Sequence, residues 1–277
     1  MVIVAGLGFT GTRLARRLLE RGVETWAPVR GIARFGNLAN AGLRLIEIAE
    51  IIEGRTSIPE GAAMALLIPP LPDLENDKLR EWILRSKPQR IVYVSSTGVY
   101  GDQTDVDADT PARPNDERGV RRIEEERWVA GGPWSSLILR AAAIYGPGRG
   151  VHAAVREGRT PRGANSGLVS RVHVDDLAAI IEAGLFSNIS GAWPVADEEA
   201  CPTSEIVRWC FEVAGMKPPA RGATATAPPL TQGRKIDGSK IREILDVALK
   251  YPDWRSGVAA SLREEQSLGS DLAVGNQ

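Results

Sequence analysis

The residues with the clearest chemical meaning are three glycines near the start of the chain. Gly6, Gly8 and Gly11 have the spacing G-x-G-x-x-G, between an apolar β-prone run (Val2–Ala5) and an amphipathic helical segment (Thr12–Arg21). This is the strand-turn-helix context of a dinucleotide-binding turn. In such a turn the glycines permit a sharp bend, backbone approach to a pyrophosphate and close helix packing, and the helix N-terminus attracts phosphate. A purely structural glycine turn is the alternative.

A second group of chemically informative residues follows the next predicted strand, Val23–Val29. This strand ends without the acidic residue that usually binds the ribose hydroxyls of NAD. Arg30 comes next, and Arg34 lies four residues later. Because guanidinium groups form charge-assisted hydrogen bonds with phosphate, these residues favour NADP over NAD. Two solvated arginines in an arginine-rich chain are the alternative.

The elements that position these residues alternate along the chain. Further strands are predicted at Leu43–Ile48, Ala63–Ile68, Arg90–Ser95, Ser135–Leu139 and Ala192–Val195. Helices are predicted at Leu79–Arg85, Gly119–Ala130, Asp175–Leu185, Thr203–Ala214 and Ser239–Leu249. This order predicts an α/β protein with a Rossmann-type, doubly wound parallel sheet and a smaller C-terminal substrate lobe. We expect residues 1–145 to form the NAD(P)-binding domain, residues 172–196 to return to it, and residues 146–171 and 197–277 to form the lobe and tail.

The composition excludes several classes of protein. The 277 residues carry a formal net charge of -1, so no basic field would recruit nucleic acid or an anionic membrane. Cys201 and Cys210 do not make a disulfide framework, and with His152 and His173 they show no zinc-site spacing. The N-terminal run is too strand-like for a signal peptide, and no apolar run could span a bilayer. We therefore expect a cytoplasmic protein without a metal site, a membrane contact or a nucleic-acid partner.

Four later motifs carry a family resemblance. They are Ser95–Gly101 (SSTGVYG), Leu139-Arg140, Ile144–Gly148 (IYGPG) and Val172–Ala178 (VHVDDLA). With the glycine turn, this ordered set resembles the extended short-chain dehydrogenases/reductases, a group that includes NAD(P)-dependent epimerases/dehydratases acting largely on nucleotide sugars. Trp193–Asp197 and Arg234–Leu245 also resemble late elements of that family. The resemblance implies an NAD(P)-dependent oxidoreductase or epimerase acting on a small polar, nucleotide-sugar-like substrate, and a homodimer by analogy.

The resemblance also implies catalytic positions, and here the chain departs from the family. Ser96 matches the hydroxyl that binds the substrate oxygen, with Thr97 beside it, although either side chain could instead cap local backbone. The family's Tyr-x-x-x-Lys pair falls at Arg118 and Arg122. Arginine cannot serve as a general acid at neutral pH. Arg118 could bind an anionic group or stabilise an oxyanion, and Arg122 could supply the charge of the lost lysine. This departure indicates the atypical branch of the superfamily.

Other roles stay open for neighbouring residues. Arg121 with Glu125, and Arg122 with Glu126, are spaced as i,i+4 ion pairs. Asp175 and Asp176 suit the N-terminus of a helix, and His173 suits a structural role. The missing tyrosine supports a second function, a non-catalytic NADP(H)-binding redox sensor.

The expected site can be stated by residue. The expected cofactor is NADP, with NAD as the alternative, and its expected contacts are Gly6, Gly8, Phe9, Thr10, Gly11, Arg30, Arg34, Pro69 and Ser95. The expected catalytic residues are Ser96, Thr97, Arg118 and Arg122.

Overall fold

The protein is built on a seven-stranded parallel sheet. The computed structural model describes residues 1–53, 55, 60–68, 73–159, 161, 167–213 and 233–274. The strand order is β11-β7-β5-β4-β1-β2-β3, and all neighbouring pairs are parallel. The strands are β1 (Val2–Ala5), β2 (Thr25–Val29), β3 (Arg44–Glu47), β4 (Ala63–Leu66), β5 (Arg90–Ser96), β7 (Ser135–Ala141) and β11 (Gly191–Val195). This sheet confirms the predicted Rossmann-type α/β fold. Strand order reverses between β1 and β4, the switch point where such sheets bind ligands.

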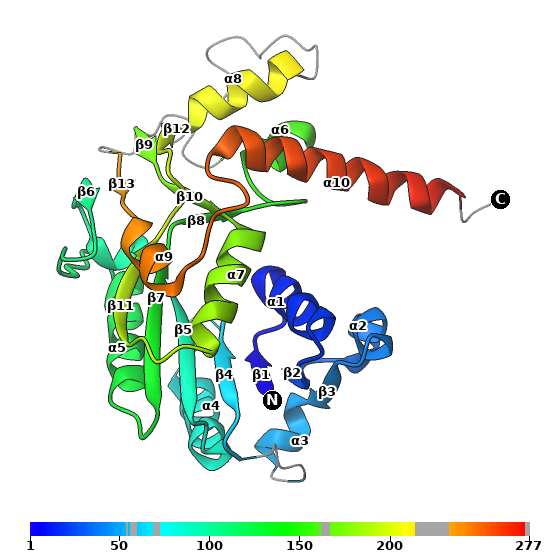
Figure 1. Cartoon of the computed structure of the whole chain (residues 1–277), viewed down its shortest axis with the longest axis vertical. Helices are drawn as coiled ribbons and strands as arrows, with labels where there is room; N and C mark the ends of the chain where they lie inside the picture. The colour runs from blue at the N-terminus through cyan, green and yellow to red at the C-terminus, as the bar shows by residue number, and fades with distance from the viewer. Residues whose placement is uncertain are drawn as a thin grey trace.

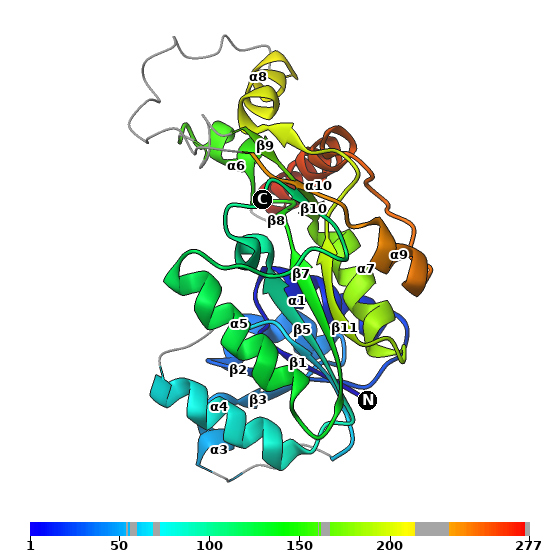
Figure 2. The same ribbon diagram turned by 90° about the vertical axis from the view of Figure 1, so that its left-hand side faces the viewer.

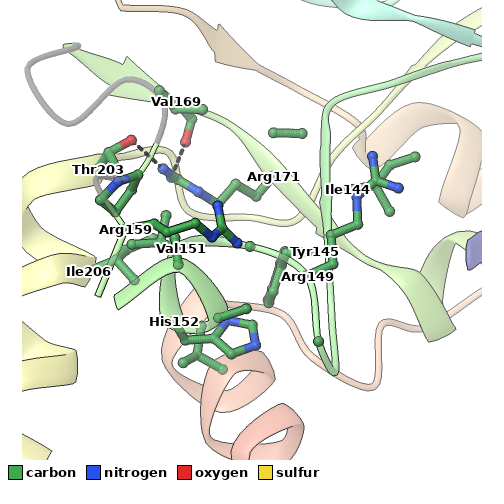
Figure 3. Close-up of a pocket in the computed structure, with 17 residues that line it drawn as sticks. Ile144, Tyr145, Arg149, Val151, His152, Arg159, Val169, Arg171, Thr203 and Ile206 are labelled. Atoms are coloured by element: carbon green, nitrogen blue, oxygen red, sulfur yellow. Dashed lines mark hydrogen bonds between the residues drawn. The ribbon is translucent and has the colours of Figure 1, made fainter. Parts of the chain in front are cut away.

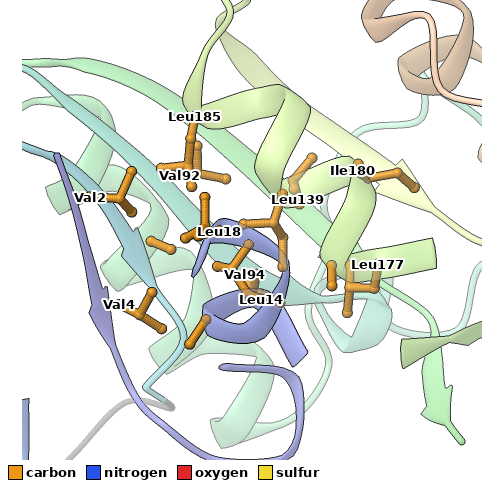
Figure 4. Close-up of a cluster of buried hydrophobic side chains, with 14 of the residues drawn as sticks. Val2, Val4, Leu14, Leu18, Val92, Val94, Leu139, Leu177, Ile180 and Leu185 are labelled. Atoms are coloured by element: carbon orange, nitrogen blue, oxygen red, sulfur yellow. The ribbon is translucent and has the colours of Figure 1, made fainter. Parts of the chain in front are cut away.

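Helices cover both faces of the sheet (Figures 1 and 2). Helices α1 (Phe9–Glu20) and α7 (Val174–Leu185) lie on one face, and α4 (Asp73–Ser86) and α5 (Glu117–Ala130) on the other. Because alternate residues of a strand point to opposite faces, Val2 and Val4 pack towards α1, whereas Ile3 packs into the opposite core. Figure 4 shows the first of these cores, with Leu14 and Leu177 contributed by the two helices.

The ends of several elements differ from the sequence-based prediction. The third strand stops at Glu47, and Ile48–Ile52 forms helix α3 instead of extending it. Helix α4 begins at Asp73, six residues before the predicted start. Helix α9 (Ser239–Leu245) is shorter than predicted because Asp246 adopts a left-handed conformation with φ of 54°, which ends the helix.

A smaller group of elements stands beyond the carboxyl ends of the sheet strands (Figure 1). It contains β8 (Ala143–Tyr145) paired with β10 (Arg171–His173), β9 (Leu168–Val169) paired with β12 (Cys201–Pro202), and helices α6 (Val151–Arg156), α8 (Thr203–Val213) and α10 (Trp254–Val274). The remaining elements are η1 (Ile32–Phe35), α2 (Gly36–Asn40), η2 (Thr97–Tyr100), β6 (Asp105–Val106) and β13 (Lys235–Ile236).

One segment connects the two regions. Helix α7 packs against α1, and β11 extends the main sheet beside β7. The division of the whole chain into two domains at the expected boundaries stays a prediction. Pro69, one of the expected cofactor contacts, lies outside the described residues.

Candidate functional site

The glycine-rich turn is tightly packed at Gly6 and Gly11 and borders open space at Gly8. Gly6 has a φ of +113°, a conformation that favours glycine. A Cβ on Gly11 would lie 2.1 Å from the carbonyl oxygen of Gly6, so helix α1 can pack on the turn only because Gly11 has no side chain. A Cβ on Gly8 would meet nothing within 4 Å. The backbone at Gly8 is therefore accessible to a ligand.

The start of helix α1 faces this open side of the turn. Gly8 is the N-cap residue and provides no side-chain hydrogen bond, and the first turn holds no acidic residue. The first N–H groups of α1 and its positive dipole end therefore suit a pyrophosphate. Thr10 is buried, and the guanidinium carbon of Arg149 lies 5.2 Å from the centre of the Phe9 ring. The side chain of Phe9 thus packs towards the loop after β8.

A cavity of about 510 Å³ opens beside the turn, at the ends of β1, β2 and β4. Its floor is apolar and includes Ile51 and Trp82, and its cations are Arg30, Arg34 and Lys78. None of its described lining residues is acidic. An apolar slot with basic groups at its edge suits an adenosine that carries a phosphate.

Sequence reasoning missed the residue that shapes the edge of this cavity. Glu47, at the end of β3, accepts hydrogen bonds from the N–H groups of Gly31 and Ile32, at 3.1 and 2.8 Å. These backbone hydrogen bonds lower the pKa of Glu47. The carboxylate thus fixes the turn that follows Arg30. An acidic residue at the end of the neighbouring strand is the signal that could have found it.

Ser95 belongs to a buried polar network. Its hydroxyl donates to Glu126 at 2.6 Å, and Arg140 donates to the same carboxylate at 2.7 Å. The guanidinium carbon of Arg140 lies 5.1 Å from the centre of the Tyr100 ring. The side chain of Ser95 therefore joins β5 to α5 and β7, and its contact with a cofactor stays a prediction.

Ser96 and Thr97 have different surroundings. The oxygen of Ser96 accepts a hydrogen bond from the N–H of Gly98 at 3.2 Å, so the alternative role as a backbone cap is present. The hydroxyl hydrogen of Ser96 is still available to donate, because this bond uses the oxygen as an acceptor. The carbonyl of Thr97 accepts from Arg234, whose Nε donates to the carbonyl of Gln103 at 2.9 Å. Arg234 therefore anchors the loop after β5.

The structure brings Ser96, Arg118 and Arg122 together at one cavity of about 570 Å³. Thr97 is not among its lining residues. A Cβ on Gly119 would lie 3.2 Å from the carbonyl oxygen of Gly98, so α5 begins in close contact with the loop after β5. This contact places the strand-end hydroxyl and the two arginines around a shared space.

The expected i,i+4 ion pairs on α5 were wrong. Arg121 pairs with Glu117 at 2.8 Å, one turn earlier rather than one turn later. Glu125 and Glu126 lie on the buried face of α5, where Glu125 pairs with Arg80 and Glu126 with Arg140. Helical spacing alone did not reveal these cross-element partners.

A third cavity, of about 540 Å³, lies in the smaller region, and Figure 3 shows it. Arg149, Arg159 and Arg171 line it together with His152, and none of its described lining residues is acidic. Arg171 is held by the protein itself, because its Nη2 donates to the hydroxyl of Thr203 at 2.8 Å. Burial lowers the pKa of His152 to about 4, so its imidazole is neutral at physiological pH. The cavity therefore suits an anionic or polar ligand.

His173 has the structural role expected for it. Asp175 and Asp176 lie in the first turn of α7, as expected, but neither caps the helix. His173 is itself the N-cap residue, and its Nδ1 accepts from the N–H of Asp175. Asp176 instead accepts from the N–H groups of Lys250 and Tyr251, at 2.7 and 3.1 Å. It thereby ties the C-terminal segment to α7.

The described ranges contain neither a candidate metal-binding cluster nor a candidate membrane-spanning helix. No group of three or more histidine, cysteine, aspartate or glutamate residues there could hold a metal ion. None of the helices in the same ranges combines the length and apolarity needed to cross a bilayer.

Several known proteins resemble this chain in sequence or in structure. No family model matches the chain. A 3-diazoavenalumate denitrifying reductase from Streptomyces is 30% identical over 173 residues, which is 55% of this chain and 55% of the reductase, so the match spans about half of that relative. The structure of a candidate NAD-dependent epimerase/dehydratase from Methylobacillus flagellatus is 28% identical, with a TM-score of 0.72 over 96% of this chain and 98% of that one. UDP-glucuronic acid 4-epimerase from Bacillus cereus, solved with UDP-glucuronic acid and NAD, has a TM-score of 0.75 at 17% identity and covers 96% of this chain and 99% of its own.

The chain has the fold of the epimerase/dehydratase-like short-chain dehydrogenases/reductases. This confirms the family resemblance found in the sequence. Within that fold, the match of Arg118 and Arg122 to the family's tyrosine and lysine stays a prediction from the sequence.

Proposed function

We propose that this chain is an NADP(H)-dependent oxidoreductase that acts on a small polar substrate. The observation that carries the proposal is the open space above Gly8 at the start of α1, where no side chain caps the helix. A pyrophosphate bound there would receive the first N–H groups of α1. The Methylobacillus and Bacillus structures, whose descriptions name NAD, support this use of the turn.

The preference for NADP is a finer part of the proposal. Arg30, Arg34 and Lys78 line the neighbouring cavity, and none of its described lining residues is acidic. Three cations favour a ribose that carries a 2′-phosphate. NAD is the alternative cofactor, since it would use the same turn and the same apolar floor.

The proposed chemistry assigns a task to each side chain. The bound dinucleotide would supply or accept the hydride. Ser96 would donate its hydroxyl hydrogen to a substrate oxygen, and Arg118 and Arg122 would stabilise negative charge near it. The cavity lined by Arg149 and His152 would hold the remainder of the substrate. A nucleotide-sugar-like substrate is one class that this cavity would accept.

The first experiment is a titration of the purified protein with NADPH and with NADH, followed by tryptophan fluorescence. Arg30→Ala should weaken NADPH binding about ten- to a hundredfold and leave NADH binding nearly unchanged. Arg44→Ala is the matched control, because Arg44 is an exposed arginine at the start of β3 that does not line the cavity and pairs with Glu24 at 3.1 Å. If neither nucleotide binds the wild-type protein, the proposal fails.

A second function is suggested by the pair of arginines that the sequence resemblance aligns with the family's catalytic positions. A redox sensor would bind NADP(H) and turn over no substrate. NADPH oxidation in the presence of a broad panel of carbonyl compounds would support the enzyme. Homodimer formation stays a prediction from the resemblance, and a cytoplasmic location stays a prediction from the composition.

A further inference from the structure

The cavity between the end of β5 and the start of α5 carries an unusual set of charges. It is lined by Ser96, Gly98, the N-cap and first residues of α5 (116–119), Arg121 and Arg122. Its lining holds three guanidinium groups and two carboxylates, which leaves one positive charge in excess. The arginines responsible for this excess charge are those that have no acidic partner in the lining.

Both carboxylates of the cavity are already engaged. Glu117 pairs with Arg121 at 2.8 Å. Asp116 accepts a hydrogen bond from the N–H of Gly119 at 2.7 Å, as the N-cap of α5. Neither acid forms an ion pair with Arg118 or Arg122 among the described residues.

The two remaining arginines differ in their freedom to move. Nη1 of Arg122 donates to the hydroxyl of Tyr93 at 3.0 Å and to the carbonyl of Val94 at 3.3 Å. Both acceptors are neutral, so they fix the guanidinium without cancelling its charge. Arg118 lies one turn earlier, is exposed, and forms no hydrogen bond or ion pair within the described part of the chain. A fixed cation and an adaptable one therefore share the cavity with Ser96.

We infer that this cavity selects a substrate that carries a carboxylate, and that Arg118 binds the carboxylate while Arg122 holds a positive charge beneath it. The inference rests on the proposed oxidoreductase function, in which a reducible group of the substrate lies beside Ser96. The planar guanidinium fork of Arg118 matches a carboxylate in a bidentate geometry. One excess positive charge suits a monoanion better than a phosphate dianion.

The test uses pairs of ligands that differ only in charge. Benzoate, cinnamate and hexanoate are compared with their amides and with phenyl phosphate by ligand-observed NMR, on wild-type protein with and without NADPH. The carboxylates should bind and the amides should not. Arg118→Gln should weaken carboxylate binding about ten- to a hundredfold, the loss expected for a charge-assisted hydrogen bond in a partly enclosed site.

Arg127→Gln is the matched control on the same helix, because Arg127 is exposed and does not line the cavity. It should leave carboxylate binding unchanged. Equal binding of carboxylates and amides, tighter binding of phenyl phosphate, absence of carboxylate binding, or equal losses in the Arg118 and Arg127 variants would each overturn the inference. Failure of the proposed function looks different, since it appears as loss of NADPH binding by the wild-type protein.

Discussion

Gly11→Ala should lower the stability of the fold, whereas Gly8→Ala should remove nucleotide binding and leave stability nearly unchanged. The Cβ of Gly11→Ala would start 2.1 Å from the carbonyl oxygen of Gly6, and contacts below 3.0 Å do not persist, so α1 must move by about 1 Å. Leu14 and Leu18 of this helix are fully buried, which makes the movement costly. Overpacking of this kind costs about 1–3 kcal/mol, and the better helix propensity of alanine offsets at most about 1 kcal/mol.

Gly8→Ala should behave in the opposite way. Its Cβ would meet nothing within 4 Å and the backbone φ of -91° accepts any residue, so stability should stay within about 1 kcal/mol of wild type. The new methyl group would occupy the space that a pyrophosphate needs, and NADPH binding should be lost. Urea unfolding measures the first effect and NADPH titration the second. A Gly8→Ala protein that binds NADPH normally, or a Gly11→Ala protein of unchanged stability, would refute the reasoning.

Three further predictions concern buried or half-buried titratable side chains. Glu126→Ala leaves Arg140 without its carboxylate and should lower the free energy of unfolding, measured by urea titration, by about 3–5 kcal/mol. Adding Arg140→Met should recover part of this loss. A loss below about 1 kcal/mol would contradict the prediction. Burial lowers the pKa of His173 to about 3, so the free energy of unfolding falls as pH drops below about 6.5, where the unfolded chain takes up a proton. Between pH 7 and 5 the free energy of unfolding of the wild type should fall by about 2 kcal/mol more than that of His173→Gln. Equal losses in the two proteins would refute this. Arg234→Met should cost at least about 2 kcal/mol and speed amide exchange in residues 97–103, and unchanged exchange would argue against an anchoring role.

The sheet was predictable because its signals are local. Each central strand is an apolar run between turn residues, and burial on both faces makes such runs continuous rather than alternating. The glycine turn was predictable for a similar reason, because Gly6 and Gly11 are required by the backbone geometry of a segment only six residues long. Element ends were less predictable: β3 ends at Glu47, one residue before its predicted end, because the apolar residue Ile48 suits a strand or the helix that begins there.

The polar contacts of the site were not predictable in the same way. Glu126 is bound by Arg140 and Ser95, which lie on two different strands, and the sequence suggested only its helical neighbour Arg122. Glu47 supports the turn after β2 from the end of a different strand. Such partners are set by strand order, which the sequence indicates only through the fold.

The pair of arginines at the cavity changes what the protein can contribute to a reaction. A guanidinium group stabilises negative charge but does not release its proton at neutral pH. The buried phenols nearby do not replace the missing acid, because burial raises the pKa of Tyr93 and of Tyr100. Tyr93 is in addition engaged by Arg122. If the chain is an oxidoreductase, its side chains therefore supply orientation through Ser96 and charge through the arginines, and the proton comes from water or from the substrate itself. This favours substrates whose reduction is helped by a nearby positive charge over simple ketones that depend on a tyrosine.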